Sequence, residues 1–152
     1  MWDFLLQLDK DALIYLNNLG TEEFDAFWSF VTHIATWIPL YLLFIFLFFL
    51  KAPKREAFLI VTWVVFLAVF ILLVTNLTKN GVARLRPNND LGINTLIRIL
   101  KTPTDFSFFS GHAATSFAIT VLVYLFLRKH YRWAYIFFVW PILFAASRIF
   151  VG

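Results

Sequence analysis

Cysteine is absent from this chain of 152 residues, and charged side chains make up only 14% of it. The absence of cysteine excludes structural disulfides, thiolate metal sites and a cysteine nucleophile. Soluble domains hold about 25% charged residues. The low charge, combined with 61% hydrophobic residues, therefore excludes a soluble domain, a disordered chain and a coiled coil. The composition indicates an integral membrane protein, and the length predicts a single domain over residues 1–152.

The few charges are distributed unevenly along the chain. The first 25 residues hold six acidic residues and one lysine, whereas the remainder holds twelve Lys and Arg residues and three acidic residues. A basic excess can indicate nucleic-acid binding. These positive charges lie between apolar runs instead of on one soluble face. We therefore expect no nucleic-acid partner and attribute the charges to membrane orientation and to an anionic ligand.

Residues 1–20 have the spacing of an amphipathic helix. Leucine, alanine and tyrosine side chains recur at three- and four-residue steps, whereas Asp3, Gln7, Asp11 and Asn18 fall on the opposite face. This periodicity predicts a helix that lies along the membrane interface.

Four apolar segments follow, and roughly 20 residues suffice to cross a bilayer. We expect transmembrane helices over 22–50, 57–78, 110–127 and 133–151, with a long loop over 79–109. Pro39 and Pro141 lie inside two of these segments and are expected to kink their helices. The predicted fold class is an all-α integral membrane helical bundle with one N-terminal interfacial helix and four transmembrane helices.

The short connections predict the orientation of this bundle. Residues 51–56 and 128–132 each contain three Lys or Arg residues, and with four spans they lie on one side of the membrane. The positive-inside rule places them in the cytoplasm. The acidic N-terminus and the long loop then lie on the outer face, which we expect to be the periplasmic or extracellular face of a bacterial cytoplasmic membrane.

Three polar clusters meet at that outer face when the membrane crossings are counted. One follows the second span, one opens the third span and one ends the fourth span. Their residues are Lys79, Arg86, Ser110, Gly111, His112 and Arg148. The topology therefore brings three cations, a hydroxyl group and an imidazole to the same depth.

These residue types suit the binding of a phosphate. Arginine offers a planar fork of donors that matches phosphate oxygens, and lysine adds a compact charge. Ser110 and Gly111 at a helix start would direct free backbone N–H groups at an anion. His112 can change protonation near neutral pH and donate a proton to a leaving oxygen. Taken singly, Arg148 could be an interfacial anchor and Ser110 a simple N-cap; the three clusters together favour a phosphate site.

At these positions the sequence resembles the type 2 phosphatidic acid phosphatase family. Residues 79–87 match its K-x6-R-P motif, residues 110–112 match the end of its P-S-G-H motif, and residues 147–148 match the start of its S-R-x5-H-x3-D motif. Phe109 replaces the proline of the second motif, which changes the entry to the helix without removing a reacting group. The order of the motifs and their flanking apolar spans agree with the family over nearly the whole chain after Thr21.

The resemblance implies a metal-independent membrane phosphatase that needs no cofactor and acts on a lipid phosphate or diphosphate. By this resemblance, His112 is the general acid, and the phosphoryl group is bound by Lys79, Arg86, Ser110, Gly111 and Arg148. Undecaprenyl diphosphate, phosphatidylglycerol phosphate, phosphatidate and lipid A phosphate present similar groups to such a site, so the residues leave the choice among them open.

In that family, the histidine of the third motif attacks phosphorus and forms a phosphohistidine that an aspartate orients. The motif spacing places this histidine two positions after Gly152, so we expect the nucleophile and the final span or spans of the family beyond the present chain. The 152 residues alone are then expected to bind phosphate without turnover. The alternative is a non-catalytic phospholipid-binding or structural membrane protein.

Overall fold

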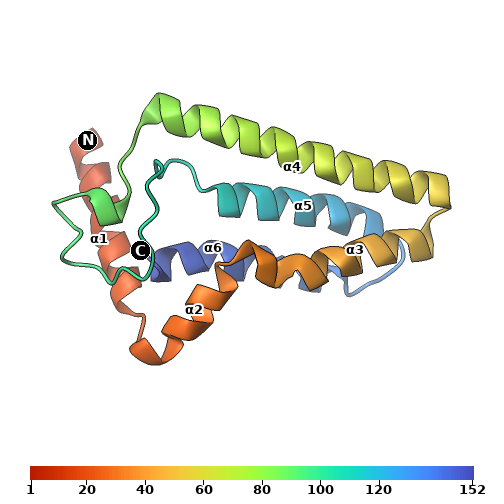
Figure 1. The fold of residues 1–152 in the computed structure, drawn as a ribbon, viewed down its shortest axis with the longest axis horizontal. Coiled ribbons are helices and arrows are strands. Elements are labelled where there is room, and N and C mark those ends of the chain that lie inside the picture. The colour runs from red at the N-terminus through yellow and green to blue at the C-terminus, as the bar shows by residue number, and fades with distance from the viewer.

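The structure, a computed structural model, describes residues 1–152 apart from the side chains of residues 2 and 3, so the expected polar-face position of Asp3 lies outside the described side chains. The backbone over these residues is helical, and short 3₁₀ turns join the helices (Figure 1). The α-helices are α1 (Trp2–Asn18), α2 (Asp25–Val31), α3 (Ile38–Lys51), α4 (Lys54–Val82), α5 (Gly111–Leu127) and α6 (Val139–Phe150). The predicted all-α class is confirmed.

Helix α5 forms the centre of the bundle. It packs between α4 and α6, and α3 lies against α4 (Figure 1). The core between these helices is apolar and rich in aromatic rings: Phe44, Leu47, Phe48, Ile119, Val123, Leu127, Phe137, Trp140 and Phe144. The long loop and both chain ends lie at one end of the bundle, and the connections after α3 and α5 lie at the other (Figure 1).

The segment 22–50, expected as one span, is divided in the structure into α2, a 3₁₀ turn over Ile34–Trp37 and α3. Side chains of that turn satisfy carbonyl groups in the last turn of α2. The Thr36 hydroxyl donates to the Phe30 carbonyl at 2.7 Å, and the Trp37 indole donates to the Val31 carbonyl at 2.9 Å. These bonds replace the backbone donors that a continuous helix would supply, so the chain can turn at this point.

The expected proline kinks are wrong, because both prolines stand at helix starts. Pro39 is the second residue of α3, and Pro141 is the third residue of α6. Proline is tolerated in the first turn because the N–H group that it lacks has no partner there. The remaining expected spans correspond to α4, which continues to Val82, to α5, and to α6 with the 3₁₀ turn Ala134–Phe138 before it.

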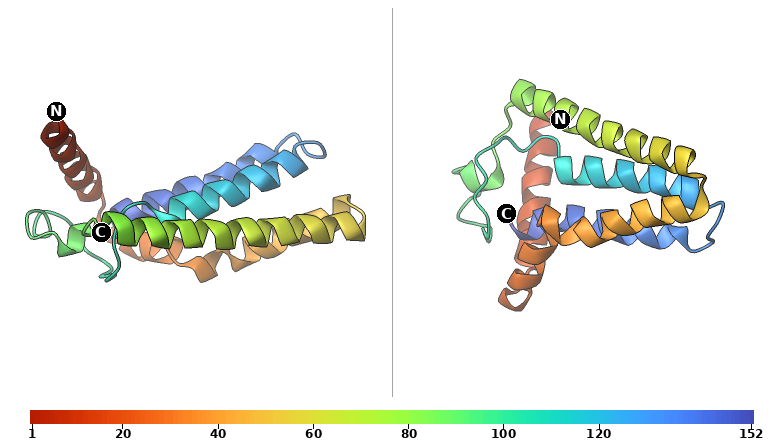
Figure 2. Two further views of the ribbon diagram at one scale, coloured as in Figure 1. Left: turned by 90° about the horizontal axis from the view of Figure 1, so that it is seen from above. Right: turned by 45° about the vertical axis from the view of Figure 1, so that its right-hand side comes forward.

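Helix α1 crosses the end of the bundle that carries the long loop (Figure 2). Asn17, which is only 1% exposed, attaches α1 to the rest of the bundle. Its amide group donates to the carbonyls of Arg98 and Ile149 at 3.1 and 2.7 Å, and its side-chain oxygen accepts from the Arg98 N–H at 2.7 Å. Leu5 and Leu8 of α1 stay exposed, which suits a helix resting on lipid.

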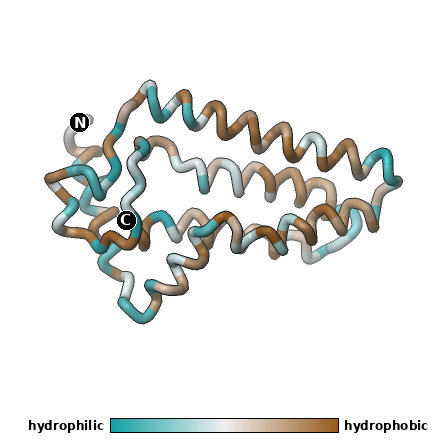
Figure 3. Tube along the Cα trace, viewed as in Figure 1, coloured by the Kyte–Doolittle hydropathy of each residue, from teal (hydrophilic) through white to brown (hydrophobic). Residues whose placement is uncertain are grey.

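The outer surface of α4 is apolar along its length. Trp63, Phe66, Phe70, Leu73 and Leu77 are all exposed, the last at 73%. A continuous exposed apolar surface of this kind requires a non-aqueous environment. The stretches Ile34–Lys51 and Lys54–Asn89 are long and apolar enough to cross a membrane, and Gly111–Leu127 and Ala134–Phe150 are shorter apolar helices. Polar residues gather at both ends of the bundle (Figure 3), so the fold is a membrane helical bundle.

Candidate phosphate-binding site

The end of α4 positions the first pair of candidate residues. Lys79 lies in the last turn of this helix, and Ala83, the C-cap residue, adopts the left-handed conformation (φ 50°). The Ala83 N–H donates to the Lys79 carbonyl at 2.8 Å. Three residues later Arg86 is extended, as expected for a residue before proline. The side chains of Lys79 and Arg86 thus come from a helix end and from the segment that leaves it.

The start of α5 provides the second group. Ser110 is its N-cap, and the Ser110 hydroxyl accepts from the Ala113 N–H at 3.3 Å. Gly111 faces α4 so closely that an added Cβ would lie 3.3 Å from the Thr75 methyl group. Gly111 therefore has a packing reason in addition to the expected approach of a ligand. The free N–H groups of this helix start and its dipole make the position suitable for an anion.

Thr32, which the sequence did not single out, links His112 to Arg148. The Thr32 carbonyl lies 3.3 Å from His112 Nε2, and Arg148 Nη1 donates to the Thr32 hydroxyl at 3.3 Å. The His112 ring also packs on Phe144, with the ring centroids 4.4 Å apart. Thr32 is buried where α2 ends, so the break in the expected first span supplies a backbone carbonyl that a continuous helix would have used.

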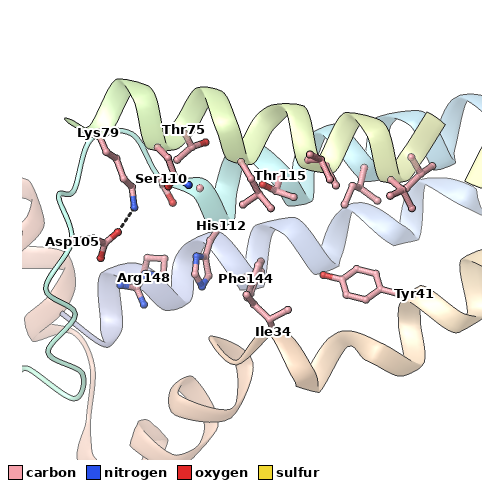
Figure 4. Close-up of a pocket in the computed structure, with 18 of the residues that line it drawn as sticks. Ile34, Tyr41, Thr75, Lys79, Asp105, Ser110, His112, Thr115, Phe144 and Arg148 are labelled. Carbon is pink, nitrogen blue, oxygen red and sulfur yellow. Dashed lines mark hydrogen bonds and ion pairs between the residues drawn. The ribbon is translucent and has the colours of Figure 1, made fainter. Parts of the chain in front are cut away.

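One pocket of about 790 Å³ contains all six residues singled out from the sequence. Lys79, Ser110, His112 and Arg148 face the same region, although they come from α4, α5 and α6 (Figure 4). From this region the pocket continues between α3, α4 and α5 past apolar side chains that include Leu72, Ile119, Val123 and Phe48. The site is thus polar at one end and apolar over most of its length.

Asp105 occupies the polar end of this pocket. Its carboxylate pairs with Lys79 Nζ at 2.5 Å and with Arg86 Nη2 at 2.8 Å. The Lys79 and Arg86 side chains are 13% and 15% exposed, whereas the Asp105 side chain is 53% exposed, so the carboxylate covers the two cations from the solvent side. Burial by itself raises the pKa of Asp105, but the bond from Lys79 and the charge of Arg86 outweigh burial and lower it.

Sequence reasoning missed Asp105, although a signal was present. It is the only acidic residue after Asp90, and it lies in the loop that separates the basic motif from the Ser110 cluster. The polar end therefore holds three cations, one carboxylate and one imidazole among its described lining residues. No group of three or more His, Cys, Asp or Glu side chains within the described part of the chain is placed to hold a metal ion.

Comparisons with known proteins agree with this geometry. Residues 60–152 match the family model of the PAP2 superfamily. A lipid A 4'-phosphatase of Bacteroides thetaiotaomicron is 28% identical over 160 residues, covering 100% of this chain and 69% of the relative. A lipid A 4'-phosphatase of Porphyromonas gingivalis is 26% identical over 157 residues, covering 99% of this chain and 64% of the relative. The chain thus spans about two thirds of the length of these relatives. No solved structure matches it.

Proposed function

The chain belongs to the PAP2 superfamily, and from this membership and the pocket we propose that it is an integral membrane phosphatase that hydrolyses the phosphate ester of a lipid. The observation that carries the proposal is the convergence of Lys79, Arg86, Ser110, His112 and Arg148 on one pocket from three separate segments. The pocket continues into an apolar region, which fits a ligand with a phosphate at one end and hydrocarbon at the other.

The substrate that we propose first is the 4'-phosphate of a lipid A-type molecule. The two relatives bear that activity in their names, and they align with nearly the whole chain. Undecaprenyl diphosphate and glycerophospholipid phosphates carry the same terminal group and are the competing candidates. We propose that the reaction takes place at the outer leaflet, because the basic connections 51–56 and 128–132 lie at the end of the bundle opposite the long loop (Figure 1).

For phosphoryl transfer, the protein mainly has to position the reacting groups and stabilise negative charge. Arg86 and Arg148 provide planar donors, Lys79 provides a point charge, and the start of α5 provides backbone N–H groups. Asp105 forms ion pairs with two of these cations. A dianionic phosphate would therefore compete with the Asp105 carboxylate for Lys79 and Arg86.

In the proposed reaction, an imidazole nitrogen from the third family motif attacks phosphorus while the bond to the lipid oxygen breaks. His112 gives its proton to that oxygen, which leaves as the lipid alcohol. Water then attacks the phosphohistidine, His112 accepts a proton from the water, and inorganic phosphate leaves as the P–N bond breaks. The contact with the Thr32 carbonyl orients the His112 ring for both transfers. We propose that the reaction uses no metal.

The test is phosphate release from a lipid A 4'-phosphate substrate by the detergent-solubilised, full-length gene product in the presence of a chelator. We expect turnover that the chelator does not reduce. The variant His112→Asn should turn the substrate over roughly 10²–10⁴-fold more slowly than wild type and should bind it with unchanged affinity. The matched control is His130→Asn, because His130 lies in the basic connection at the far end of the bundle. Binding of lipid phosphates without any phosphate release would instead support the non-catalytic alternative.

A further inference from the structure

The end of α1, the long loop and the end of α6 meet at one end of the bundle (Figure 1). The Asn17 amide group donates to the Arg98 carbonyl in the loop and to the Ile149 carbonyl in α6, and the Asn17 oxygen accepts from the Arg98 N–H. The N–H groups of residues 100 and 101 donate to the Val151 carbonyl at 2.9 and 3.2 Å. This part of the loop is thus fixed to the end of α6 through backbone groups.

The Arg98 side chain adds an ion pair with α2. Both carboxylate oxygens of Asp25, the first residue of α2, accept from Arg98 Nη2. The Arg98 and Asp25 side chains are only 26% and 29% exposed. The guanidinium also lies so close to Gly20 that an added Cβ there would be 3.1 Å from Arg98 Nη1. These three residues, Asn17, Asp25 and Arg98, are called the Arg98 cluster below.

Two more ion pairs join α1 to the long loop, and they are more exposed. Asp9 pairs with Arg84, and Lys10 pairs with Asp90. In each pair at least one side chain is 37% exposed or more, and solvent screens ion pairs of this kind, so they contribute little. The acidic excess at the N-terminus therefore faces basic residues of the loop, and the Arg98 cluster is the part of this contact that is best shielded from water.

The two segments that the Arg98 cluster joins both carry residues of the phosphate site. Arg148 directly precedes Ile149 on α6 and lines the pocket. Arg86 and Asp105 lie on the loop and line the same pocket, and Arg86 Nε donates to the Asp105 carbonyl at 2.9 Å. None of the three clustered residues is among the described residues that line the pocket. The cluster therefore bears on the site through the position of the loop and not through contact with a ligand.

On the basis of the proposed function, we propose that Asn17 and Asp25 are positioning residues of the phosphate site that act through Arg98. They fix the loop against α6, so that the guanidinium groups of Arg86 and Arg148 reach the same phosphoryl group. A loop released from α6 would present Arg86 for only part of the time. The apparent affinity for an anion falls with the fraction of molecules in the binding geometry, so a loosened loop weakens binding.

The test is calorimetric titration of the detergent-solubilised protein with vanadate, with the Tm of each variant measured alongside. Asp25→Asn keeps the size of the side chain and removes its charge, and Asn17→Leu removes three buried hydrogen bonds. Asp25→Arg combined with Arg98→Asp restores the ion pair in the reverse sense. The matched control is Phe137→Leu, because Phe137 is a core residue that is 7% exposed and is not among the residues that line the pocket.

We expect Asp25→Asn to weaken vanadate binding about fivefold, as for a loop in the binding geometry for roughly one fifth of the time. Asn17→Leu should weaken it further, and the charge swap should recover most of the loss. Phe137→Leu should lower the Tm, as large-to-small core substitutions do, and keep the wild-type affinity. If Asn17→Leu does not fold, Asp25→Asn and the swap decide the outcome.

Unchanged vanadate affinity in Asp25→Asn, a swap that recovers nothing, or an equal loss in Phe137→Leu would overturn the positioning role. Absence of vanadate binding by wild type would instead refute the phosphate site of the proposed function, and the positioning role with it. The two failures are therefore distinguished by the wild-type titration alone.

Discussion

Asp105 pairs with Lys79 and Arg86, two of the cations that we expect to bind the phosphate, so its removal should strengthen phosphate binding. In Asp105→Asn the carboxylate charge is lost, and the Lys79 and Arg86 side chains become free to bind an incoming anion. The opposite expectation follows if Asp105 instead holds the two cations in the geometry that phosphate requires. The sign of the change in affinity therefore distinguishes a competitor from a positioning residue.

The magnitude follows from the contacts. A charge-assisted hydrogen bond contributes about 1.5–3 kcal/mol, but a half-exposed carboxylate is screened by solvent. With the Asp105 side chain 53% exposed, we expect about 1 kcal/mol, or fivefold tighter phosphate binding. Because the pKa of Asp105 is lowered, its contact with Lys79 stabilises the loop fully above the ordinary aspartate pKa and is lost as the pH falls through the lowered value. The gain in the variant should therefore be complete at neutral pH.

The assay is calorimetric titration of the detergent-solubilised protein with inorganic phosphate and vanadate at neutral pH. Asp90→Asn is the matched control, because Asp90 lies in the same long loop and pairs with Lys10 at 2.9 Å, and it is not among the residues that line the pocket. Weaker phosphate binding in Asp105→Asn would refute the competition. An unchanged affinity would show that the pair with Lys79 lies outside the phosphate site.

Three further predictions concern the cations, the topology and the attachment of α1. Arg86→Ala and Arg148→Ala should each weaken vanadate binding by about 1.5–3 kcal/mol in the same titration, and unchanged affinity in both would contradict a shared site. A cysteine introduced at Asn89 should react with an impermeant reagent outside intact cells, whereas one at His130 should not; the reverse pattern would move the pocket to the cytoplasm. Asn17→Ala should destabilise the protein by about 2–3 kcal/mol, seen as a lower Tm, since it removes three buried hydrogen bonds.

The fold class and the convergence of the motifs could be predicted because both depend on patterns along the chain. Long apolar runs require helices in a bilayer, and counting crossings decides which helix ends share a face. Counting the crossings predicts that Lys79, Ser110 and Arg148 lie at the same face, and the structure places all three in one pocket. The catalytic and binding roles assigned to them remain predictions.

The break after α2 and the position of Asp105 depend on contacts that these patterns do not contain. Hydropathy treats 22–50 as one apolar run, whereas Thr36 and Trp37 end α2 through side-chain bonds to its carbonyls. Asp105 lies in a loop without periodicity, and its partners are 19 and 26 residues away.

We propose that residues from α4, α5 and α6 form one phosphoryl-binding site. An experimental structure of the protein with bound vanadate tests it most directly, because vanadate adopts the geometry of a phosphoryl group in transfer. We expect vanadate at the polar end of the pocket, contacted by Lys79, Arg86 and Arg148 and by the start of α5, with His112 beside it and the Asp105 carboxylate displaced. Vanadate bound elsewhere, or an Asp105 pair that stays intact beside an empty pocket at saturating vanadate, would contradict it.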